Sequence, residues 1–129
     1  MATALDMVTT VIGALFGDPS DARAPLTGTG IGTVGHEGTA RVAETAEEAI
    51  AMMQPGDVLV TRATSPAFNL VLSTAGGLVT VHGGPMSHAA VLSRELGLPA
   101  VIGVADCLDH ISTGDTVVVD PVRGVVSIR

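Results

Sequence analysis

The sequence predicts a small domain of the α/β or α+β class, in which short strands alternate with amphipathic helices. From about residue 38 onward, short apolar runs recur between glycine, proline or polar residues, as is typical of strands. The segments between these runs carry apolar residues at helical spacing and capping residues at their ends. With 129 residues, 47% of them hydrophobic, the chain can bury one core, and a second domain is not expected.

The first 27 residues are predicted to be a separate segment. Leu5, Val8, Ile12 and Leu15, with Phe16, make one apolar stripe of a helix. The stripe either packs on its own domain or docks on a partner subunit, and the pattern does not decide between these. Residues 17–28 are rich in Asp, Pro, Ser and Gly, which is typical of a linker. The predicted organisation is therefore an extra N-terminal helix with its linker, residues 1–27, and a domain over residues 28–129.

The elements of the domain follow in chain order. A helix is predicted over residues 44–53, because Thr45 and Glu48 have the spacing of a capping box and Pro55-Gly56 ends the pattern. Ser65 and Pro66 form a good N-cap and N1 pair for a helix through residue 73. Strands are predicted at residues 38–42, 57–62, 78–81, 100–102, 116–120 and 125–128, the last two joined by a turn at residues 121–124.

A glycine pattern at residues 30–35, Gly-Ile-Gly-Thr-Val-Gly, matches the G-x-G-x-x-G spelling of dinucleotide-binding sites. The context argues against that function. No hydrophobic strand precedes the pattern, and the residues after it alternate like a strand instead of opening a helix.

Charge and cysteine content exclude several functions. Thirteen acidic residues against six arginines give a net charge of −7, so nucleic acid is a poor partner. The chain has no lysine, which excludes a P-loop for ATP. The apolar N-terminal run is too short to cross a bilayer, and no membrane association is expected. Cys107 is the single cysteine; it fits a reducing cytoplasm and is predicted to be a small buried hydrophobe.

His88 is the strongest candidate for a functional residue. It follows the glycine-rich turn of residues 83–87 and is predicted to be the first residue of a helix over residues 88–96, with Ser87 as N-cap and Gly97 as the stop. A neutral imidazole, with a pKa of about 6.5, is a nucleophile near neutral pH. The first turn of a helix favours anions, and Gly83 and Gly84 allow close approach of a phosphate. The pattern suggests a phosphoryl-carrying histidine, although on these residues alone a turn or capping residue is the more frequent explanation.

The segment GGPMSHAAVLSRELGLPAVIG, residues 83–103, resembles the swivelling phosphohistidine domain of the phosphoenolpyruvate-utilising enzymes, such as pyruvate phosphate dikinase, phosphoenolpyruvate synthase and rifampicin phosphotransferase. The resemblance extends to PGDVLVTRATSPAF, residues 55–68, to GTARV, residues 38–42, and to STGDTVVVDPVRGVVSI, residues 112–128. It implies a three-layer swivelling β/β/α fold. At the site it implies His88 as the catalytic residue and Thr64, Gly83, Gly84 and Ser87 as phosphate- or substrate-binding residues. Met86 stands where the dikinase pattern has a regulatory threonine.

The resemblance implies a phosphotransferase component in which His88 takes a phosphoryl group from ATP or phosphoenolpyruvate and passes it to an acceptor held elsewhere. No cofactor is expected on this chain. Mg-ATP or phosphoenolpyruvate is expected on a partner, an ATP-grasp-like subunit or domain, and the acceptor on a further module. The chain is either a free-standing cytoplasmic subunit or a segment of a larger enzyme. The rival interpretation is a non-catalytic docking or regulatory module that keeps the fold.

The other histidines favour structural or surface roles. His36, His82 and His110 lack the close spacing and the cysteine or carboxylate support of zinc ligands, so no metal site is expected. A metal site that uses both His82 and His88 is a third alternative. His110 next to Asp109 resembles an orienting pair, although such a pair in a polar loop is usually solvated.

Overall fold

The computed structural model describes residues 24–129, and the predicted N-terminal apolar stripe lies outside the described residues. The helices are α2 (Ala46–Met52), a 3-10 turn η1 (Pro66–Phe68) that runs into α3 (Asn69–Leu72), α4 (His88–Leu96) and α5 (Cys107–His110). The strands are β1 (Leu26–Thr27), β2 (Thr29–Ile31), β3 (His36–Val42), β4 (Val58–Thr61), β5 (Gly77–Thr80), β6 (Ala100–Ile102), β7 (Thr116–Asp120) and β8 (Val125–Ile128). No helix in the described part of the chain is long and apolar enough to cross a membrane.

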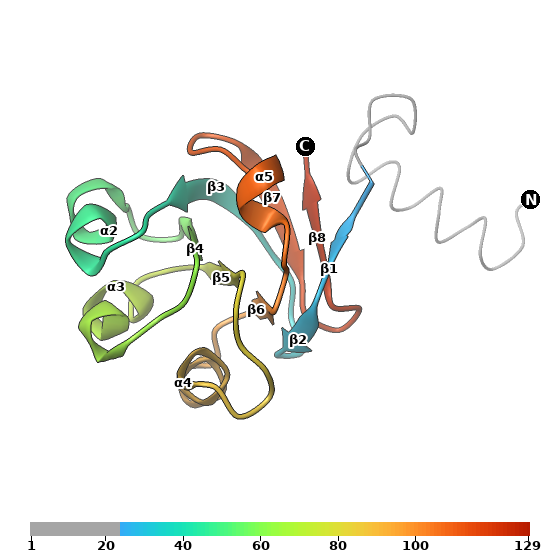
Figure 1. Ribbon diagram of the computed structural model, residues 1–129, viewed down its shortest axis with the longest axis horizontal. Helices are drawn as coiled ribbons and strands as arrows, with labels where there is room; N and C mark the ends of the chain where they lie inside the picture. Colours follow the sequence, from blue (N-terminus) through green and yellow to red (C-terminus); the bar gives the residue numbers. More distant parts are fainter. Residues whose placement is uncertain (1–23) are drawn as a thin grey trace, which may run out of the picture.

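Strand β3 belongs to both halves of a sheet that folds over on itself. Its first part, from His36, pairs antiparallel with β7, and its last part, from Ala40, pairs parallel with β4. The strand order is β1-β8-β7-β3-β4-β5-β6-β2. Figure 1 shows the outcome: α2, α3 and α4 lie on one side of β4, β5 and β6, and β7, β8 and β1 lie on the other. This is the three-layer β/β/α arrangement implied by the resemblance.

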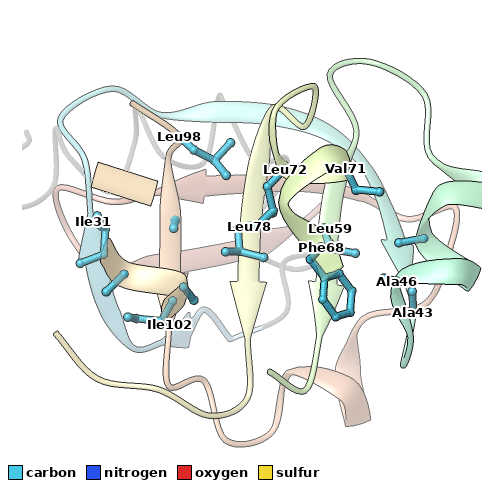
Figure 2. Close-up of a cluster of buried hydrophobic side chains, with 14 residues drawn as sticks. Ile31, Ala43, Ala46, Leu59, Phe68, Val71, Leu72, Leu78, Leu98 and Ile102 are labelled. Carbon is cyan, nitrogen blue, oxygen red and sulfur yellow. The ribbon is translucent and has the colours of Figure 1, made fainter. Parts of the chain in front are cut away.

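Two apolar cores hold the three layers together. Successive residues of a strand point to opposite faces, so each central strand contributes to both cores. The core beneath the helices, shown in Figure 2, includes Leu59, Leu78 and Ile102. The core between the two halves of the sheet includes Val60, Val79 and Val101, packed with residues of β7 and β8. Because β4, β5 and β6 are buried on both faces, their sequences are continuous apolar runs.

The short elements β1, β2 and α5 were not predicted from the sequence. Leu26 and Thr27, assigned above to the linker, pair with β8, and Thr29–Ile31 pair with β6. The chain crosses between the two halves of the sheet at Gly28, whose N–H donates to the carbonyl of Gly124 at 3.0 Å. The glycine pattern then turns from β2 into β3, so no helix follows it, as predicted.

The two predicted N-cap residues, Thr45 and Ser65, are confirmed in position, but only Thr45 forms side-chain capping bonds. Thr45 and Glu48 form the predicted capping box: the N–H of Glu48 donates to Thr45 Oγ1 at 3.1 Å, and the N–H of Thr45 donates to Glu48 Oε1 at 3.0 Å. Ser65 occupies the N-cap position before Pro66, but its side chain makes no capping bond. The segment begins as a 3-10 turn, in which the carbonyl of Ser65 accepts from the N–H of Phe68 at 2.9 Å.

Replacement of Gly30 by alanine is expected to destabilise the fold. A Cβ at this position would overlap the carbonyl oxygen of Pro121, in the turn between β7 and β8. We expect a loss of about 2 kcal/mol in the free energy of unfolding. Gly84→Ala is the matched control, because nothing lies within 4 Å of a Cβ there; its effect should stay within about 1 kcal/mol. Urea unfolding followed by circular dichroism measures both, and equal effects would contradict this account.

Alkaline pH is expected to weaken the contribution of Cys107 to the free energy of unfolding. As predicted, this side chain is a buried member of the core between the sheets. Burial, followed by the negative charge of Asp106, raises the pKa of the thiol to about 11, above its ordinary value of 9.0. The folded protein therefore binds the thiol proton more tightly than the unfolded chain, so this contribution is complete below pH 9 and is lost as the pH rises toward 11. The difference in unfolding free energy between wild type and Cys107→Ala should narrow over that range, whereas a constant difference would refute the assignment.

Candidate functional site

His88 is the first residue of α4, and the helix begins and ends as its sequence predicts. Ser87 Oγ accepts a hydrogen bond from the N–H of Ala90 at 3.2 Å, which makes Ser87 the N-cap. Gly97 ends the helix with a φ of +66°, in the left-handed region that favours glycine. These two capping residues fix the position of His88 as the first residue of the helix.

The turn before His88 is tied together by its own hydrogen bonds. Ser87 Oγ donates to the carbonyl of Gly84 at 2.8 Å, so the hydroxyl proton of Ser87 is used within the turn. Gly83 has a φ of +127°, and a Cβ on it would lie 3.0 Å from Ser87 Oγ, so this position requires glycine. Gly84 faces open space, with no atom within 4 Å of a Cβ built on it. An incoming group can therefore approach the backbone at Gly84.

Thr64 and His88 are brought into direct contact by the sheet. Strands β4 and β5 pair in parallel, with Thr61 opposite Thr80, so the segments that follow them leave from the same edge. Thr64 lies just after β4 and His88 follows the turn after β5. Thr64 Oγ1 and His88 Nδ1 are 2.9 Å apart and share a hydrogen bond. Within residues 24–129 the structure gives Nε2 of His88 no hydrogen-bond partner, whereas Nδ1 is engaged by Thr64.

The ring of His88 is half-buried and lines an open pocket. The other residues of the pocket wall are Pro66, Asn69, Met86, Val91, Leu92 and Glu95. The wall contains no arginine, and the chain has no lysine. The pocket therefore gives access to the histidine from solvent without a fixed cation beside it.

The remaining histidines lie away from this pocket wall. His36 Nε2 donates to the carbonyl of Gly56 at 2.7 Å and is a structural residue between β3 and the segment before β4. His82 is exposed after β5. His110 lies in α5, and its Nε2 is 3.4 Å from a carboxylate oxygen of Asp106. No cluster of three or more potential metal ligands occurs among residues 24–129.

Two contributors to the site were not predicted from the sequence. Arg94 donates from Nη1 to the carbonyl of Pro85 at 2.7 Å and so braces the turn. Gly103, with a φ of +72°, lets the segment after β6 pack against the turn, because a Cβ there would lie 2.9 Å from the carbonyl oxygen of Gly83. The sequence pattern of α4 does not show that the turn before His88 folds back to meet Arg94. Gly103 is the last residue of the segment that carries the family resemblance, and this position could have marked it as part of the site.

The family model for the mobile domain of PEP-utilising enzymes matches residues 53–124, a span that contains both Thr64 and His88. A phosphoenolpyruvate synthase from Aeropyrum pernix is 46% identical over 89 residues, which are 69% of this chain and 11% of that protein. A pyruvate kinase from Lactobacillus delbrueckii subsp. bulgaricus is 41% identical over 99 residues, 77% of this chain and 17% of that protein. The chain thus spans only a small part of the length of these relatives.

Solved structures share the fold. A solution structure of Enzyme I has a TM-score of 0.53 and 29% identity, and the match covers 60% of this chain and 32% of that one. A chain of Thermococcus kodakaraensis aconitase X has a TM-score of 0.62 at 18% identity, covering 83% of this chain and 99% of that one, which shows the fold alone. Because the family model covers more than half of the sequence, including the whole of the candidate site, this chain belongs to the family of PEP-utilising enzyme mobile domains.

Proposed function

We propose that this chain carries a phosphoryl group on Nε2 of His88, taking it from ATP or phosphoenolpyruvate held by a partner module and delivering it to an acceptor held by another. Membership of the family, with relatives named phosphoenolpyruvate synthase and Enzyme I, supports a phosphotransfer domain. The observation that carries the specific proposal is the 2.9 Å hydrogen bond between Thr64 Oγ1 and His88 Nδ1, which selects the reacting nitrogen.

The hydrogen bond to Thr64 selects the reactive tautomer in this mechanism. When Nδ1 carries the proton and donates it to Thr64 Oγ1, the lone pair of the neutral ring is on Nε2. That lone pair attacks the phosphorus atom in line, the new N–P bond forms, and the bond from phosphorus to the leaving oxygen breaks. The proton stays on Nδ1 throughout, where Thr64 stabilises the positive charge that develops on the ring.

The start of α4 stabilises the transferred group. The first intrahelical hydrogen bond runs from Val91 to the carbonyl of Ser87, so the N–H groups of His88 and Ala89 have no acceptor within the helix. These N–H groups and the partial positive charge of the helix start favour a phosphoryl group. The open space at Gly84 gives the phosphoryl oxygens room, while Gly83 and Ser87 shape the turn.

The donor and the acceptor belong to other modules in this proposal. Without a lysine the chain cannot form a P-loop, so Mg-ATP or phosphoenolpyruvate is bound by a partner such as an ATP-grasp-like domain. Magnesium accompanies the nucleotide on that partner. A buried, reduced Cys107 and these donors fit a cytoplasmic location.

Phosphorylation of His88 by a small donor tests the carrier function. We expect phosphoramidate, which needs no protein partner, to place one acid-labile phosphoryl group on His88, located by mass spectrometry. The exposed His82 is an internal control and should react more slowly, because none of the side-chain hydrogen bonds found among residues 24–129 fixes the tautomer of its ring. His88→Gln should remove the modification. If His88 stays unmodified while His82 reacts, the rival docking or regulatory module becomes the better interpretation.

Replacement of Thr64 by valine keeps the side-chain shape and removes the hydrogen bond to Nδ1. Loss of one such bond, about 1 kcal/mol, should slow phosphorylation by roughly fivefold. Nitrogen-15 NMR of the histidine ring should show the Nδ1–H tautomer in the wild type and a mixture in the variant. Thr64→Ser, which retains the hydroxyl, should restore both. An unchanged tautomer and rate in Thr64→Val would exclude this role for Thr64.

A further inference from the structure

A second cavity lies beside the second half of α4. Its volume is about 290 Å³, and its wall shares no residue with the pocket of His88. One side of the cavity is the turn after β2, which runs from Ile31 through Gly32 to Val34, and the other side is α4. This turn belongs to the glycine pattern of residues 30–35, to which the proposed function assigns no role.

The pairing of β2 with β6 forms the cavity. Ile31, the last residue of β2, lies opposite Ala100, the first residue of β6. Gly32 then turns the chain with a φ of +118°, in the region that favours glycine. Gly97, which ends α4, and Pro99 complete the wall. Because the two glycines have no side chains, the space between the turn and the helix is not filled.

A buried hydroxyl without a partner belongs to this wall. Ser93 lines the cavity and is 1% exposed. Its Oγ has no hydrogen-bond partner among residues 24–129. Buried polar side chains nearly always have a partner, because a hydroxyl removed from water and left without a hydrogen bond costs free energy. Ser93 is therefore available to hydrogen-bond a molecule that enters the cavity.

The cavity also has a positive charge. Among the described residues of the wall, Arg94 alone is charged. Arg41, Arg62 and Arg129 each pair with a carboxylate of this chain. Arg94 instead donates from Nη1 to the neutral carbonyl of Pro85. That bond leaves the edge formed by Nε and Nη2, and such an edge binds a carboxylate through two parallel hydrogen bonds.

We propose that this cavity binds a small monocarboxylic acid with a branched aliphatic tail. The carboxylate pairs with Nε and Nη2 of Arg94 and accepts a hydrogen bond from Ser93 Oγ. The tail lies against Ile31, Val34 and Pro99, which make much of the wall apolar. A volume of about 290 Å³ is at the lower end of the range for ligand pockets and fits a small acid. The site would bind this acid whether or not His88 carries a phosphoryl group.

Titration with isovalerate, followed by the amide signals of a nitrogen-15-labelled sample, tests the site. We expect saturable shifts in the turn after β2 and in the second half of α4, with a Kd on the order of 1 mM. Isovaleramide has the same tail without the charge and should bind about tenfold more weakly, because a neutral amide does not form an ion pair with Arg94. Acetate keeps the charge but lacks most of the tail, and it should also bind about tenfold more weakly.

Three variants locate the bound acid. Ser93→Ala should weaken isovalerate binding about fivefold without lowering the unfolding temperature, because it removes a hydroxyl that has no partner in the ligand-free chain. Arg94→Gln should abolish the preference for isovalerate over isovaleramide. Arg129→Gln is the matched control, because it removes the same charge outside the cavity wall, and it should bind isovalerate as the wild type does.

Three results would overturn the site. The first is the absence of saturable shifts in the wild type. The second is equal affinity for isovalerate and isovaleramide, because an unspecific apolar contact would then account for the binding. The third is wild-type affinity for isovalerate in both Ser93→Ala and Arg94→Gln, since the acid would then bind elsewhere on the chain.

Discussion

The parallel register of β4 and β5 is the constraint on which the site depends. Val58 lies opposite Gly77 and Thr61 opposite Thr80, so both strands end at one edge and the chain must turn there after each. Thr64 and His88, which are 24 residues apart, meet at that edge. A slip of one residue would send Leu59 to the face of Val60 and disrupt both cores together. Packing on both faces of the sheet therefore maintains the hydrogen bond between Thr64 and the imidazole of His88.

The turn that carries His88 is held by hydrogen bonds on its inner side and is exposed to solvent on its outer side. Ser87 Oγ donates to the carbonyl of Gly84, and Arg94 donates to the carbonyl of Pro85. Gly103 lets the segment after β6 pack against Gly83. Met86, at the outside of the same turn, is almost fully exposed. A turn held at its base keeps the imidazole in place while its outer side chain is left to contact other molecules, which is how rigid scaffolds commonly present functional loops.

The sequence predicts an element correctly where the residues that determine it lie close together in the chain. Helix α4 was predicted to the residue because Ser87 and Gly97 each act within a few positions of the helix end. Strand β2 was missed because three residues that include Gly30 carry almost no pattern, and their strand geometry comes from pairing with β6, far along the chain. The contact between Thr64 and His88 is non-local in the same way. The resemblance marked Thr64 as a site residue, but only the register of the sheet shows that it binds Nδ1.

The absence of a cation from the pocket wall also affects how reversible phosphoryl transfer would be in the proposed function. A guanidinium fixed beside the phosphoryl group would stabilise the loaded form in every position of the domain and would raise the barrier to unloading. Here Arg62 pairs with Glu44, and Arg94, which donates to the carbonyl of Pro85, is not part of the pocket wall. In the proposed function, the helix start and Thr64 are then the stabilising groups. The proposed carrier would therefore leave the strong electrostatic stabilisation of transfer to the modules that hold the donor and the acceptor. In that proposal, the phosphoryl group is loaded at one module and unloaded at the other, and the carrier itself adds little difference in free energy between the two.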